Sequence, residues 1–189
     1  RNRVGQFCFC RDVTIERTFE HQIWISANTD ALTGLYNRRF FYEYMNENRK
    51  ENQLSLLYVD LDDFKKVNDA HGHHIGDGAL ELVARLMREA FPGDFIVRLG
   101  GDEFLICLVG ERSLAFLEEK ANRLLQSLLE AFQVSDYLRV MSASIGIASS
   151  ADPGTKLDDL VRQSDIAMYA AKQSGKSRCC VYSSGLIKK

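Results

Sequence analysis

The sequence predicts an α+β fold: a ferredoxin-like sandwich in which helices flank a central, mostly antiparallel five-stranded sheet. Two observations support this fold class. Two short apolar runs, 94–97 and 105–109, enclose the stretch Arg98-Leu99-Gly100-Gly101-Asp102-Glu103-Phe104, whose paired glycines are typical of a tight hairpin turn. Around this hairpin, apolar strands alternate with segments of helical periodicity, which predicts helices that cross over the sheet.

The chain is expected to divide into three parts. Residues 1–13 carry a short alternating apolar run with no local partner, which we interpret as the tail of a preceding domain. Residues 14–29 switch to helical spacing and form a linker helix, which either packs on its own domain or pairs with a second chain. Residues 30–189 form the main domain.

Within the main domain, helices and strands follow in an order that gives one sheet with helical crossovers. Asn37 is a candidate N-cap for the first helix. The expected helices are 38–49, 64–70, a second one ending near 90, 113–132 and 157–174. Besides the hairpin, the expected strands are 54–59, 139–148 and 178–182.

Composition excludes several classes of protein. The 189 residues have a formal net charge of -2, which gives no electrostatic case for binding nucleic acid. No apolar run approaches the ~20 residues of a membrane span, although an anchor elsewhere in a longer protein stays open. The five cysteines are odd in number and lack paired zinc-site spacing, which favours a reducing cytoplasmic location. The first residue is Arg1 and not Met, so we expect a longer protein.

Carboxylates cluster where the first strand of the main domain ends. Asp60, Asp62 and Asp63 follow the apolar run 54–59. If this strand neighbours the hairpin, Asp60 and Asp102 meet at one point. Hard oxygen ligands without His or Cys suit Mg²⁺ or Mn²⁺, and two such ions can assist phosphoryl transfer.

Several groups near these carboxylates can hold phosphates. The backbone N–H groups that start the helix after Asp62 would be free to hold phosphates, and Lys65 adds a positive charge there. Lys172 and Lys176 lie four residues apart near the end of the last helix. A single lysine at such a position is more often a solvated surface charge than a ligand-binding group. The bare backbone of Gly100 and Gly101 lets a phosphate or sugar approach closely.

Five ordered motifs between residues 30 and 178 resemble the GGDEF family, the diguanylate cyclases. They are Asp30-x-Leu32-Thr33-Gly34-Leu35-x-Asn37-Arg38-Arg39, Asp60-x-Asp62-x-Phe64-Lys65-x-x-Asn68-Asp69, Gly72-His73-x-x-Gly76-Asp77, Gly100-Gly101-Asp102-Glu103-Phe104, and Ala167-Met168-Tyr169-x-Ala171-Lys172-x-x-Gly175-Lys176. Residues 5–17 resemble the last strand of a PAS sensor domain that continues into its output helix.

The resemblance implies a palm fold similar to the nucleotidyl cyclases, and condensation of two GTP into cyclic di-GMP with loss of two pyrophosphates. It implies two Mg²⁺ or Mn²⁺ per GTP site, an upstream sensor domain, and a second GGDEF domain as homodimer partner. The implied metal ligands are Asp60, Asp102 and the carbonyl of Leu61, with Glu103 as a charge partner in the site. Asn68 and Asp77 are implied to contact guanine. The implied phosphate-binding groups are the backbone of Asp62, Asp63, Phe64 and Lys65, with Lys172 and Lys176.

Other interpretations remain open. Asp77 is also a good N-cap, and Asn68 near a helix end can satisfy a carbonyl. The whole domain can be a catalytically silent module that binds GTP or cyclic di-GMP, or a variant that accepts other purine nucleotides. One departure from the family concerns the Arg-x-x-Asp product-binding motif. Here it reads Phe91-Pro92-Gly93-Asp94, and Phe91 cannot hold a guanine or a phosphate, so product inhibition through this site is expected to be absent.

Overall fold

A computed structural model describes residues 14–48, 53–150 and 154–188. The expected tail of a sensor domain, residues 1–13, lies outside the described residues. The helices are α1 (Thr14–Asn28), α2 (Arg38–Asn48), α3 (Phe64–His71), α4 (His73–Ala90), α5 (Leu114–Val134), α6 (Leu157–Gln173) and the short 3₁₀ helix η1 (Ser184–Lys188). The strands are β1 (Tyr36–Asn37), β2 (Leu54–Asp62), β3 (Phe95–Gly100), β4 (Glu103–Val109), β5 (Ser142–Ser149) and β6 (Arg178–Val181).

The strands form one sheet in the order β1-β3-β4-β2-β5-β6. The three central pairings, β3 with β4, β4 with β2 and β2 with β5, are antiparallel, and the two outer pairings are parallel. The predicted α+β class with a mostly antiparallel sheet is therefore confirmed. The predicted number of five strands is wrong, because the described residues include a sixth, β1, whose two residues are too short to show alternation.

Among the expected strand boundaries that differ from the structure, two bear on the site. β2 continues to Asp62, because both of its neighbours keep pairing with it as far as the carboxylates. Asp60 and Asp62 therefore lie within the strand and not after it. β5 starts at Ser142, later than expected, because turns precede it, with hydrogen bonds from Leu138 N to Ser135 O and from Met141 N to Leu138 O.

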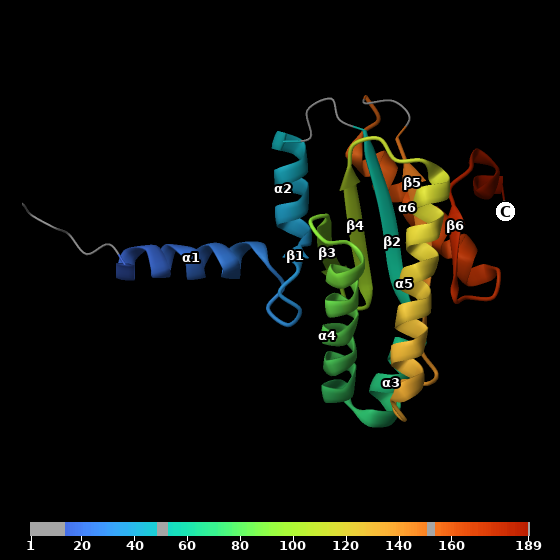
Figure 1. Ribbon diagram of the computed structural model, residues 1–189, viewed down its shortest axis with the longest axis horizontal. Coiled ribbons are helices and arrows are strands. Elements are labelled where there is room, and N and C mark those ends of the chain that lie inside the picture. Colours follow the sequence, from blue (N-terminus) through green and yellow to red (C-terminus); the bar gives the residue numbers. More distant parts are fainter. Residues whose placement is uncertain (1–13, 49–52, 151–153, 189) are drawn as a thin grey trace, which may run out of the picture.

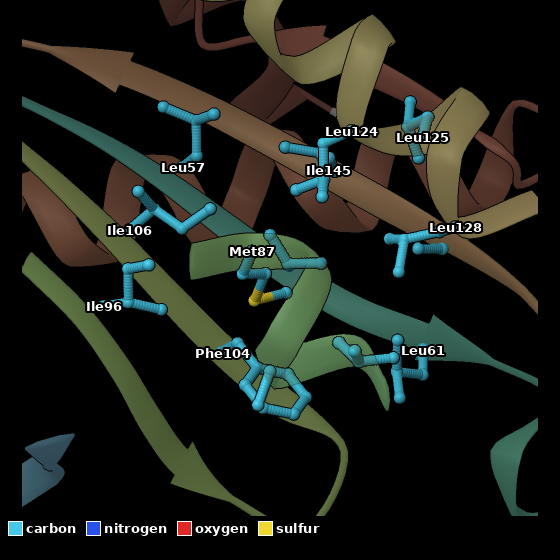
Figure 2. Packing of buried hydrophobic residues seen from close by; sticks show 14 of the residues in the cluster. Leu57, Leu61, Met87, Ile96, Phe104, Ile106, Leu124, Leu125, Leu128 and Ile145 are labelled. Atoms are coloured by element: carbon cyan, nitrogen blue, oxygen red, sulfur yellow. The ribbon is translucent and has the colours of Figure 1, made fainter. Parts of the chain in front are cut away.

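The sheet separates two helical layers (Figure 1). All nine residues of β2 are buried, as expected for a central strand covered on both faces. Leu57, Val59 and Leu61 face α4 and α5, whereas Tyr58 belongs to the core on the side of α2 and α6. Figure 2 shows the first of these cores, where Met87 of α4 lies over the strands close to Phe104 of β4.

The second face of the sheet brings α6 very close to β5. A Cβ atom at Gly146 would lie 1.9 Å from the carbonyl oxygen of Ser164 and 2.2 Å from the backbone nitrogen of Met168. Only glycine permits this approach of a helix to a strand. The close packing brings the last turn of α6, with Lys172, to the same face of the sheet as Asp60.

The helix α1 projects from the body of the molecule (Figure 1). Its end is tied down by Asn37, whose Nδ2 donates to the carbonyl of Ala27 (2.9 Å). Oδ1 of Asn37 accepts from Phe40 N (2.9 Å), so the predicted N-cap of α2 is confirmed. Phe19 and Ile23, four residues apart on α1, are 62% and 65% exposed, so these two apolar side chains are not covered by their own domain. Its role as a linker stays a prediction.

Among the described helices, none has both the length and the hydropathy needed to cross a bilayer.

Candidate functional site

The site lies where β2 ends and the hairpin of β3 and β4 turns. Asp60 of β2 is the Cα partner of Glu103 on β4, and Leu61 N donates to the carbonyl of Asp102 (3.2 Å). Asp60 and Asp102 come from distant parts of the chain, and the antiparallel pairing of their strands brings them to one edge of the sheet. This is the meeting point that the sequence predicts.

The turn itself is built by two glycines. Gly101 has a φ of 52°, in the left-handed region that favours glycine, and Gly100 has a φ of 150°. The register of β3 against β4 shifts between Arg98 and Gly100, so the ladder is irregular just before the carboxylates. Directly after this irregularity, Glu103 pairs with Asp60 near the end of β2.

Asp60 is a buried carboxylate with a lysine beside it. Its side chain is 9% exposed, and Nζ of Lys172 lies 2.6 Å from its Oδ1. Burial raises the pKa of Asp60 to about 6; Lys172 opposes this rise, and the nearby Asp102 and Glu103 add to it. The carboxylate of Asp60 is therefore harder to ionise than a solvated aspartate, and the cation of Lys172 favours its charged form.

The carboxylate of Asp62 is used by the fold. Its oxygens accept hydrogen bonds from Oγ of Ser142 (2.7 Å), Oγ of Ser144 (2.9 Å) and N of Ser177 (3.3 Å). Asp62 is 1% exposed and Ser144 is fully buried. Its side chain thus links β2 to β5 and to the loop after α6, which leaves only the backbone of Asp62 for the phosphate contact that the resemblance implies.

Asp63 and Lys176 meet beside this loop. Nζ of Lys176 lies 2.9 Å from Oδ2 of Asp63, and Nζ of Lys66 lies 2.9 Å from its Oδ1. Hydrogen bonds from Lys66 and Lys176 lower the pKa of Asp63. In the described part of the chain, the non-glycine residues with positive φ are Asp63, Lys176 and Ser177, so backbone strain is concentrated here, as it often is at functional sites.

The first turn of α3 carries the remaining predicted phosphate-binding residues. Phe64 is 9% exposed and packs into the core, where it anchors the start of the helix. Lys65, the next residue, is exposed. The backbone at this helix start is therefore held in place by Phe64, while Lys65 is free to reach a ligand in solvent.

The two predicted guanine contacts lie on adjacent helices. Oδ1 of Asn68 on α3 is buried and has no hydrogen-bond partner among the described residues. It sits against α4, since a Cβ at Gly76 would lie 2.0 Å from it. Asp77 is exposed inside α4, which begins at His73, so the interpretation of Asp77 as an N-cap is wrong.

Sequence reasoning missed four side chains of this region. Ser142 and Ser144 bind Asp62, and Arg98 binds the carbonyl of Gly101. Tyr58 is 7% exposed, and burial together with the neighbouring Glu103 raises its pKa. Only Tyr58 leaves a usable signal, because it stands two positions before Asp60 on a buried strand and therefore on the same face.

The donor set at this edge fits a hard divalent cation. Asp60 and Asp102 supply carboxylate oxygens, and the backbone of Leu61 lies between them. The described residues contain no cluster of three His, Cys, Asp or Glu side chains that could hold a metal by themselves. Such a set suits Mg²⁺ or Mn²⁺, which often bind one or two carboxylates and complete their coordination with substrate phosphates and water.

The sequence profile described as "Diguanylate cyclase, GGDEF domain" matches residues 27–178. The chain belongs to the GGDEF family. It is 37% identical over 186 residues to the cyclic di-GMP phosphodiesterase PdeR of Escherichia coli. This alignment covers 96% of this chain and 28% of PdeR. It is 31% identical over 188 residues to a diguanylate cyclase of Vibrio cholerae, covering 95% of this chain and 57% of that protein.

The same GGDEF fold is seen in a solved structure of the coiled coil and GGDEF domain of DgcB from Caulobacter crescentus in complex with c-di-GMP. The TM-score is 0.78 at 28% identity, over 88% of this chain and 93% of that chain. The predicted similarity to the nucleotidyl cyclase palm is thereby confirmed. The chain spans about a quarter to three fifths of the length of the two relatives above.

Proposed function

We propose that this GGDEF domain is a diguanylate cyclase. The 3′-hydroxyl of one GTP attacks the α-phosphate of another, the new O–P bond forms, and pyrophosphate leaves; a second such step closes cyclic di-GMP. The observation that carries the proposal is the meeting of Asp60 with the complete turn Gly100-Gly101-Asp102-Glu103-Phe104. The similarity to a V. cholerae diguanylate cyclase and to DgcB supports it.

Asp60, Asp102 and the carbonyl of Leu61 are the groups that would hold two Mg²⁺ or Mn²⁺ with each GTP. Bound there, the metal would supply positive charge that acidifies the 3′-hydroxyl and offsets charge on the phosphate. The raised pKa of Asp60 supports this role, since a cation relieves the cost of burying its charge. Glu103 is its cross-strand neighbour and a charge partner in the site.

Lys172 and Lys176, with the backbone of residues 62–65, would bind the β- and γ-phosphates. Both lysines are paired with carboxylates, Lys172 with Asp60 and Lys176 with Asp63. Nucleotide binding would therefore exchange one set of ion pairs for another. The lysines are 30% and 43% exposed, so both can turn toward a phosphate, and the metal would then take the place of Lys172 as the counter-charge of the buried Asp60.

Asn68 and Asp77 would distinguish guanine from adenine. Oδ1 of Asn68 lies against Gly76 without a donor, and by turning outward it could accept from the Watson–Crick edge of guanine, which presents two adjacent N–H donors. A base without them would leave this oxygen unsatisfied, which costs binding free energy.

Catalysis would require two domains. Each domain holds one GTP and the product is two-fold symmetric, so two copies meet face to face. The exposed face of α1 and an upstream PAS-like sensor would regulate how often they meet, and the cytoplasm is the expected location.

The first test incubates the concentrated chain with GTP and Mg²⁺ and separates the products by chromatography. Cyclic di-GMP is expected from the parent chain and not from Asp102→Ala. The specific rate should rise with enzyme concentration while dimers form. A rate strictly proportional to enzyme down to monomeric dilutions would contradict the dimer mechanism.

The second candidate is a catalytically silent module that binds GTP or cyclic di-GMP and regulates an attached domain. It is favoured by the match to PdeR, a protein named as a phosphodiesterase, over almost the whole of this chain. The match covers 28% of PdeR, so that name does not identify what this segment does. GTP binding without any product at high enzyme concentration would establish this alternative.

A further inference from the structure

Arg98 bridges two segments that lie far apart in the chain. From β3, its Nη1 donates to Oδ1 and Oδ2 of Asp30 at 3.0 and 3.2 Å. Its Nε and Nη2 donate to the carbonyl oxygen of Gly101 at 3.1 and 2.8 Å. The side chain is only 13% exposed. A guanidinium suits this double contact, because its donors are fixed in a planar fork.

The turn that Arg98 holds has little packing of its own. Gly100 and Gly101 are exposed, and a Cβ at either position would meet nothing within 4 Å. Glycines also have the largest backbone freedom to lose. Leu61 N, from β2 beside the hairpin, donates to the carbonyl of Asp102. Arg98, from β3 of the hairpin itself, donates to the carbonyl of Gly101, just before Asp102. Two successive carbonyls of the turn are thus held by hydrogen bonds, one from Arg98 and one from Leu61.

Asp30, the other end of the bridge, is itself fixed. Its Oδ1 also accepts from N and Oγ1 of Thr33 at 2.8 and 2.7 Å. Asn37 lies opposite Arg98 in the pairing of β1 with β3 and donates to the carbonyl of Ala27 at the end of α1. Arg98 is thus bound to the segment from Asp30 to Asn37, which has hydrogen bonds of its own at both ends. This fixed anchor allows Arg98 to restrain the turn.

We propose that Arg98 is a positioning residue that, anchored by Asp30, holds the Gly100–Gly101 turn so that Asp102 faces the end of β2. Its effect on turnover rests on the proposed cyclase function, whereas its effect on the turn does not. Arg98 acts through its hydrogen bonds to the backbone carbonyl of Gly101.

The test compares Arg98→Lys with Arg85→Gln. A lysine ammonium cannot span Asp30 and Gly101 together, so turnover of GTP should fall about 10- to 100-fold, as expected for a misplaced catalytic group. KM for GTP should change little, because Lys172 and Lys176 are untouched. Arg85 is an exposed residue of α4 paired with Glu89 and serves as the control, with turnover unchanged.

The second readout is hydrogen exchange at the Leu61 amide, which donates to Asp102 and needs no activity. Arg98→Lys should speed this exchange at least about 10-fold while exchange in the centre of β2 stays slow. An unchanged Leu61 rate, or a faster rate with normal turnover, would overturn the proposal. If the parent chain makes no cyclic di-GMP, the cyclase proposal fails. The proposal for Arg98 is then decided by the exchange rate of the Leu61 amide and by the affinity for Mn²⁺, which should weaken in Arg98→Lys.

Discussion

Nζ of Lys172 lies 2.6 Å from Oδ1 of Asp60. The cation proposed to bind phosphate therefore stabilises the carboxylate proposed to bind metal, and the ligand-free site carries its own counter-ion. The same arrangement recurs beside it, where Lys176 pairs with Asp63 at 2.9 Å. The charged side chains that would bind GTP and metal thus neutralise one another while the site is empty.

Asp60→Asn should stabilise the protein near neutral pH in the presence of EDTA. The pKa of Asp60 is raised from 3.8 to about 6, so the stability it contributes is complete below pH 4 and is lost as pH rises to 6. The variant should therefore gain up to about 3 kcal/mol in the free energy of unfolding above pH 6 and nothing at pH 4.

Urea unfolding across this pH range measures the effect, with the exposed Asp136→Asn as a control. A variant less stable than the parent chain at every pH would contradict the assignment.

Gly146→Ala should destabilise the protein by at least about 2 kcal/mol, because its Cβ would lie 1.9 Å from backbone atoms of α6. Gly78→Ala is the matched control inside α4, where a Cβ meets nothing within 4 Å. It should stabilise by about 0.5–1 kcal/mol through helix propensity. Urea midpoints of the two variants should move in opposite directions, and equal shifts would argue against the close contact between β5 and α6.

Ser144→Ala should cost about 1.5–3 kcal/mol, because its hydroxyl donates to the buried carboxylate of Asp62. Ser55→Ala removes a buried hydroxyl of the same size that pairs with Ser149 at 3.0 Å, and its loss should cost only about 1 kcal/mol. Denaturant titrations compare them. Equal losses would mean that the charge of Asp62 adds nothing to its hydrogen bonds.

Cyclic di-GMP should not inhibit through residues 91–94. Phe91 is fully buried, and Nζ of Lys120 lies 4.8 Å from the centroid of its ring, so this position belongs to the core and presents no group to a ligand. Product titration of the parent chain and Asp94→Ala should therefore give the same curve. Sub-micromolar inhibition that disappears in Asp94→Ala would refute this.

Local patterns in the sequence predicted most of the secondary structure correctly. The pattern predicts the hairpin around Gly100 and Gly101 because two glycines between apolar runs are compatible with few structures other than a tight turn. The cap at Asn37 could be predicted because capping acts within one turn of a helix. The strand β1 could not be predicted, since two residues have no periodicity and pair only because β3 lies beside them.

For the candidate site, local patterns predict which residue types meet: carboxylates at the end of one strand, and glycines followed by acids at the tip of a hairpin. The partners of these side chains depend on how distant elements pack together. Asp62 accepts hydrogen bonds from Ser142 and Ser144, which lie 80 and 82 positions away in the sequence, and Lys172 forms an ion pair with Asp60. The reason is physical: periodicity records which face of an element is buried, whereas the partner of a buried charge depends on which strands and helices are packed beside it.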